Sequence, residues 1–66
     1  MTIRVNGEPI ELPAPLSVAA LLAQLDIDGR RVAVEHNGLV VKRDRYESLL
    51  VRAGDEIEIV NFVGGG

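Results

Sequence analysis

The sequence contains no cysteine and no tryptophan, and it has one tyrosine, one phenylalanine and one histidine. The absence of cysteine excludes disulfides, thiolate metal sites and cysteine nucleophiles. His36 has neither a cysteine nor a second histidine to share a metal ion with, so we predict no metal site. It follows Val32 and Val34 at the spacing of a strand, and we expect a partly buried residue at a strand edge.

Long hydrophobic runs and a strong charge of either sign are also missing. No apolar stretch approaches the roughly 18 residues that cross a bilayer, and the start of the chain does not resemble a secretion signal. We therefore expect a cytoplasmic protein that does not bind a membrane. Seven basic against ten acidic residues give a net charge of −3, which argues against nucleic-acid binding and favours a partner with a basic surface.

The acidic residues show no pair spaced for acid–base catalysis. Asp26, Asp28, Asp44 and Asp55 fall at predicted helix ends and turns, where aspartate caps backbone N–H groups, so we interpret all four as structural. A chain of 66 residues forms one small domain and leaves little material for a deep cleft. We predict no catalytic residue, no bound cofactor and no enzymatic activity.

The first half of the chain changes from a strand pattern to a helix pattern. Thr2–Val5 and Ile10–Leu12 alternate polar and apolar residues around Asn6-Gly7, which predicts a β-hairpin. Prolines 13 and 15 then end the second strand. Ser17 is placed to cap a helix that runs to about Asp26, before Asp28-Gly29. The apolar face of this helix consists of Val18, Leu21, Leu22 and Leu25.

The second half predicts more strands. A third strand covers 32–35 and ends at the Asn37-Gly38 turn, and a short fourth strand covers 39–41. We expect a helical turn within 44–50 and a last strand over 56–63. A helix between the hairpin and later strands must cross the sheet, which predicts an α+β fold with a mixed sheet of four to five strands and one main helix on one face.

The end of the sequence is Gly64-Gly65-Gly66, which we separate as a flexible tail from a domain at 1–63. Three extended residues span roughly 10 Å, enough to carry a terminal carboxylate into a narrow channel of another protein. This carboxylate is an anion at neutral pH and a poor electrophile. If a separate enzyme joined it to AMP, a sulfur or nitrogen nucleophile could attack it. The alternative is a frayed end or a cloning remnant.

The last predicted strand has two unlike faces. With Ile57 and Ile59 in the core, Val60 and Phe62 point to the exposed face and form an apolar docking patch beside the tail. Glu56 and Glu58 share this face and would meet a basic partner surface. The alternative is a bulge that turns Val60 or Phe62 inward.

The chain as a whole resembles the ThiS family, the β-grasp (ubiquitin-like) sulfur carriers of thiamin thiazole synthesis. The similar segments are Ile3–Gly7, Ser17–Leu22, Val32–Gly38, Val41–Arg43, Gly54–Val60 and the glycine tail. The resemblance implies that an E1-like enzyme uses ATP to adenylate Gly66, which then becomes a thiocarboxylate. It also implies a sulfur donor of the cysteine desulfurase system and transfer of the sulfur to thiazole synthase. Lys42 departs from the family pattern, which often has proline there.

Three other functions fit parts of the same pattern. The small subunit of molybdopterin synthase resembles this chain in fold and tail but is usually longer. A ubiquitin-like modifier would also use a glycine tail, although Lys42 is the one lysine on which this chain could polymerise. A non-covalent interaction module of the same fold would bind its partner without Gly65 and Gly66.

Overall fold

The computed structural model describes residues 1–62 of the 66. The predicted Gly64-Gly65-Gly66 tail and Val63 lie outside this range. The strands are β1 (Thr2–Val5), β2 (Glu8–Glu11), β3 (Leu16–Ser17), β4 (Val32–His36), β5 (Leu39–Val40), β6 (Leu50–Val51) and β7 (Glu56–Asn61). Helix α1 covers Val18–Gln24, and two 3₁₀ helices cover Gly29–Arg31 and Arg43–Arg45.

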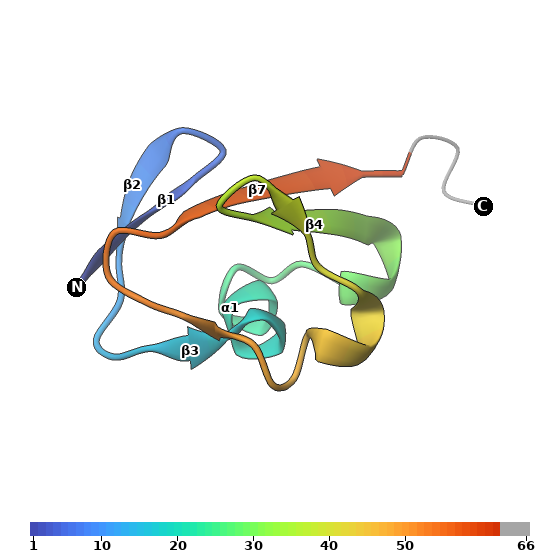
Figure 1. The fold of residues 1–66 in the computed structure, drawn as a ribbon, viewed down its shortest axis with the longest axis horizontal. Helices are drawn as coiled ribbons and strands as arrows, with labels where there is room; N and C mark the ends of the chain where they lie inside the picture. Colours follow the sequence, from blue (N-terminus) through green and yellow to red (C-terminus); the bar gives the residue numbers. More distant parts are fainter. Residues whose placement is uncertain (63–66) are drawn as a thin grey trace.

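Five strands form one mixed sheet in the order β2-β1-β7-β4-β5, and α1 lies against one of its faces (Figure 1). The pair β1 and β7 is parallel, whereas the other neighbours are antiparallel. The predicted α+β fold, with four to five strands and one main helix, is confirmed. The last strand of the chain therefore lies in the centre of the sheet.

Both Asn-Gly turns adopt the conformation that closes a two-residue hairpin. The φ angles are 51° and 84° at Asn6 and Gly7, and 50° and 87° at Asn37 and Gly38. Positive φ at both central residues defines the turn type whose twist matches that of the flanking strands. These turns set the register of β1 with β2 and of β4 with β5.

Helix α1 begins as predicted and ends earlier. The Ser17 hydroxyl accepts a hydrogen bond from the Ala20 N–H at 3.0 Å, which caps the first turn. The helix ends at Gln24 rather than near Asp26, because Asp26 takes a left-handed φ of 60°. Its N–H donates to Ala23, and the next N–H, of Ile27, donates to Leu22, the pairing of a Schellman motif.

The segment 44–50 contains the predicted helical turn, since the Leu49 N–H donates to the Arg45 carbonyl at 2.9 Å, the i to i+4 bond of one α-helical turn. A 3₁₀ helix ends at Arg45, and Leu50 and Val51 form β6, which pairs with β3 in a small second sheet. Pairing with residues more than thirty positions earlier in the chain cannot be inferred from the local pattern. It supplies core residues, since Tyr46 is buried and Leu49 packs partly buried against the core, whereas Leu50 is 43% exposed.

The core lies between α1 and the five-stranded sheet. The helix buries Val18, Leu21 and Leu22, and Leu25 packs partly buried at the margin, as predicted. The whole buried set is Ile3, Val5, Leu12, Val18, Leu21, Leu22, Val32, Val34, Val41, Tyr46, Val51 and Ile57. Within residues 1–62 no helix is long and apolar enough to cross a membrane.

Candidate docking face

Strand β7 separates a buried face from an exposed one. Ile57 is buried and Ile59 packs partly buried against the core, whereas Val60 is 57% exposed and Phe62 is 50% exposed. The register between β4 and β7 runs without a break from Val32 opposite Asn61 to His36 opposite Ile57. No bulge therefore turns Val60 inward, and the predicted exposure of Val60 and Phe62 is confirmed. Their role in docking stays a prediction.

The neighbouring strands extend this exposed surface. Ala33 on β4 lies opposite Val60, and Val40 on β5 lies opposite Glu35 and is 73% exposed. Directly opposite residues of antiparallel strands point to the same face. We call Ala33, Val40, Val60 and Phe62 the docking face. The sequence reasoning missed Ala33 and Val40, although the two-residue Asn-Gly turn before β5 could have placed Val40 opposite Glu35.

Acidic side chains occupy the same side of the sheet. Glu58 lies directly opposite Glu35, and both belong to the outer face together with Glu56. Like charges directly opposite each other destabilise a strand pair. The ion pairs found within residues 1–62 join Arg30 to Asp28 and His36 to Asp55, so these glutamates take part in neither. A basic partner would relieve the repulsion between Glu35 and Glu58.

Of the four aspartates predicted to cap backbone N–H groups, Asp28 and Asp55 do so, whereas within residues 1–62 the side chains of Asp26 and Asp44 form no hydrogen bond. The Asp28 carboxylate accepts hydrogen bonds from the backbone and side chain of Arg30, and these lower its pKa to about 2. Asp26 occupies the helix end described above, and Asp44 is an exposed residue of the second 3₁₀ helix. No cluster of histidine and acidic residues suited to a metal ion occurs within the described part of the chain.

The Asp55 carboxylate forms hydrogen bonds with residues of neighbouring turns at one end of the sheet. It lies 2.7 Å from His36 Nε2, and it accepts hydrogen bonds from the Arg52 N–H at 2.9 Å and from the Asn37 amide at 3.3 Å. His36 is partly buried as expected, but β4 lies between β7 and β5 and is not an edge strand. The expected edge position is wrong because β5 pairs with the end of β4 and covers that edge.

The sulfur-carrying residue predicted from the sequence, Gly66, and its neighbours Gly64 and Gly65 lie outside the described residues. The division into a domain at 1–63 and a tail at 64–66 therefore stays a prediction. What the structure describes is the base from which this segment starts. Phe62 is the last described residue, and its N–H donates to the Arg31 carbonyl at 3.0 Å.

A mixed sheet with a parallel central pair, crossed by one helix, defines a protein of the β-grasp class. The ThiS family model matches residues 3–66. The chain thus belongs to the ThiS family of sulfur carriers of thiamin biosynthesis. The crystal structure of the thiamine biosynthesis protein ThiS of Geobacter metallireducens is 36% identical, with a TM-score of 0.88 and full coverage of both chains.

Curated relatives include both short and long proteins. The sulfur carrier protein ThiS of Bacillus subtilis is 32% identical over 65 residues, which cover 97% of this chain and 98% of that protein. A thiazole synthase of Paramagnetospirillum magneticum is 44% identical over all 66 residues of this chain. The chain spans 20% of the length of this thiazole synthase, and the same share of a second one from Magnetococcus marinus.

Proposed function

We propose that this chain carries sulfur on the carboxylate of Gly66 and donates it to the thiazole of thiamin. The observation that carries the proposal is the ThiS family match, which continues through Gly66. The exposed apolar residues Val60 and Phe62, which shortly precede the glycine tail in the sequence, support it. The same match favours thiamin biosynthesis over a molybdopterin carrier or a protein modifier.

The chemistry requires activation by a separate E1-like enzyme that uses ATP. A carboxylate oxygen attacks the α-phosphorus of ATP, and pyrophosphate leaves. The outer sulfur of a persulfide from a cysteine desulfurase system then attacks the carbonyl carbon, and AMP leaves. A thiol of a partner protein must next cleave the resulting acyl disulfide, forming a disulfide with the inner sulfur and releasing the thiocarboxylate. The chain has no cysteine and thus contributes the acyl group, while the partners contribute the catalytic groups.

The recipient of the sulfur is a thiazole synthase. Two relatives with that name contain a segment 44% and 41% identical to the whole of this chain, so a segment similar to this chain belongs to the same polypeptide as the synthase there. The docking face, with Glu56 and Glu58 beside it, is the surface that would contact these enzymes. Exposed apolar residues with acidic neighbours fit an interface with an apolar centre and a basic rim.

Intact mass spectrometry tests the proposal. With ATP, the activating enzyme and a sulfur donor, the protein should gain the mass difference between sulfur and oxygen, localised to its C-terminal peptide. Gly65→Val should prevent this gain, because a β-branched side chain adds bulk and restricts the backbone where the enzyme must close around it.

Ala14→Val is the matched control, since it adds a β-branched side chain at an exposed loop position far from the tail in the sequence. It should acquire sulfur at the wild-type rate. If Gly65→Val is also loaded at the wild-type rate, the tail is not the working segment and the proposed function is wrong.

A further inference from the structure

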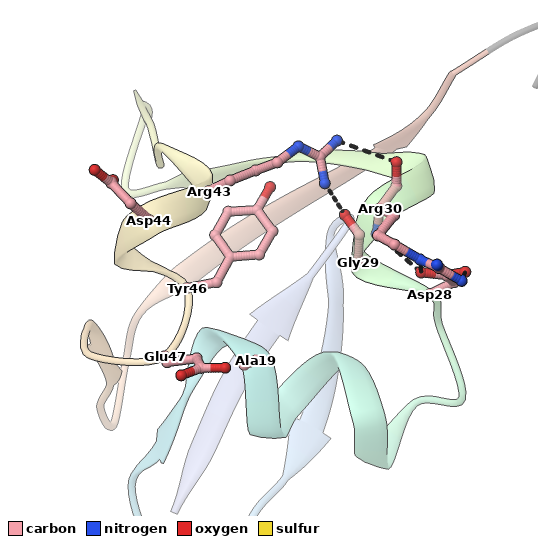
Figure 2. A pocket seen from close by; sticks show the side chains of 8 residues that line it. All are labelled: Ala19, Asp28, Gly29, Arg30, Arg43, Asp44, Tyr46 and Glu47. Carbon is pink, nitrogen blue, oxygen red and sulfur yellow. Dashed lines mark hydrogen bonds and ion pairs between the residues drawn. The ribbon is translucent and has the colours of Figure 1, made fainter. Parts of the chain in front are cut away.

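Arg43 lies beside the base of the tail and binds the backbone of a segment distant in sequence. Its guanidinium donates hydrogen bonds to the carbonyls of Gly29, of Arg30 at 3.2 Å and of Val32 at 3.3 Å. Figure 2 shows the Arg43 side chain extended above the Tyr46 ring towards the Gly29 and Arg30 carbonyls. One side chain thereby fixes the 3₁₀ helix that precedes β4.

The remaining carbonyl of this stretch belongs to Arg31 and accepts the N–H of Phe62 at 3.0 Å. Four consecutive carbonyls, from Gly29 to Val32, are therefore bound by Arg43 and by the last described residue before the tail. The Arg31 N–H donates to the Asp28 carbonyl and not to the segment around Phe62. Among the described backbone hydrogen bonds, the one from the Phe62 N–H to the Arg31 carbonyl is therefore the one that holds Phe62 beside β4. The position of Phe62 depends on how firmly this stretch of backbone is held.

The same guanidinium contacts the Phe62 side chain. Its central carbon lies 5.7 Å from the centre of the Phe62 ring and 6.0 Å from the centre of the Tyr46 ring. A planar guanidinium can stack on rings and donate in its own plane at the same time. A lysine ammonium keeps the charge but lacks the fork that reaches several carbonyls at once.

We propose that Arg43 is a positioning residue for sulfur loading, because it fixes Phe62, the last described residue before the segment that ends at Gly66. This role rests on the proposed function, in which an enzyme must receive the terminal carboxylate in its active site. When the starting residue of a short segment is fixed, its end reaches the active site of the enzyme in the correct orientation in a larger fraction of the encounters between the two proteins.

Arg43→Lys tests the role, with Arg45→Lys as the matched control. Arg45 belongs to the same 3₁₀ helix, and within residues 1–62 its side chain makes no hydrogen bond or ion pair. For Arg43→Lys we expect the Phe62 amide to exchange with solvent about tenfold faster, while the Ile59 amide keeps its wild-type rate. Arg45→Lys should change neither rate.

Steady-state adenylation gives the functional measurement. Arg43→Lys should lower kcat about tenfold and leave KM within about twofold, because Ala33, Val40 and Val60 of the docking face are held by strand pairing that does not involve Arg43. Phe62→Leu removes the ring that the guanidinium covers and should lower kcat as well. In the double variant the two effects should not add, since both changes break one contact.

The outcomes separate this role from the proposed function. If the wild-type protein gains no sulfur, the function and the role of Arg43 in it both fail. If Arg43→Lys is adenylated with the wild-type kcat, or its Phe62 amide exchanges as in Arg45→Lys, Arg43 does not position the tail although the function stands.

Discussion

Val60→Asp places a charge in the docking face without touching the core. Val60 is 57% exposed, so less than half of the roughly 1.5 kcal/mol for full burial of a valine is lost, about 0.6 kcal/mol. Replacing a β-branched residue by aspartate within a strand costs up to about 1 kcal/mol more. We expect a total loss of about 1.5 kcal/mol, a fall of roughly 6–12 °C in Tm at about 4–8 °C per kcal/mol.

The loss of partner binding should be larger than the loss of stability. An unpaired carboxylate buried in an apolar contact costs about 2 kcal/mol or more, which raises the KM for the carrier about thirtyfold in an adenylation assay. Leu39→Asp is the matched control. Leu39 is 75% exposed and lies in register with His36 and Ile57, so its side chain is on the opposite side of the sheet.

Two results would refute this reasoning. Equal KM values for Val60→Asp and Leu39→Asp would show that the partner does not use the docking face. Global unfolding of Val60→Asp at room temperature, with Leu39→Asp folded, would show that Val60 contributes to the core. Circular dichroism of both variants must therefore accompany the kinetic measurements.

Three further changes test the fold. Leu21→Ala empties a fully buried site and should lower the free energy of unfolding by about 2–5 kcal/mol, measured with urea. Gly38→Ala forces a side chain onto a φ of 87° and should cost about 1–2 kcal/mol in the same measurement. Partial burial acts to raise the pKa of Asp55, but its hydrogen bonds lower the pKa overall, so its stabilisation is present above about pH 4 and lost as the pH falls through the lowered value. Asp55→Asn should be less stable at pH 7 and lose less stability than the wild type between about pH 4 and pH 2.

Local signals in the sequence were sufficient for most of the fold. Two Asn-Gly turns and the spacing of the helix apolar face each depend on a few neighbouring residues, and the structure has all of them. The pairing of β3 with β6 was missed because it joins Leu16 to Val51 across the whole helix and two strands. The early end of α1 depends on the left-handed conformation of Asp26, which an aspartate adopts only in some contexts.

The candidate site, like the fold, has a part that local sequence signals predict and a part that depends on distant residues. Exposure of Val60 and Phe62 follows from alternation along one strand, and it was predicted. The contributions of Ala33 and Arg43 depend on which residues lie opposite or above β7 in the folded chain. Arg43 in particular contacts Phe62 across nineteen positions of sequence, and its charged neighbours Lys42, Asp44 and Arg45 give no sign of such a contact.

In the proposed function, the place of β7 in the sheet would couple partner docking to delivery of the tail. The first residues of β7 pair with both β1 and β4. Further along, the Asn6 side-chain amide replaces β1 as the partner: its oxygen accepts from the Ile59 N–H, and its NH₂ group donates to the Ile59 carbonyl. Beyond Ile59 the described bonds to β7 come from the β4 side. The docking face and the tail therefore share one short piece of chain, held at a fixed point of the sheet. From Val60 to Gly66 an extended chain reaches at most about 20 Å, so an enzyme that binds Val60 must have its adenylation centre within that distance of the contact.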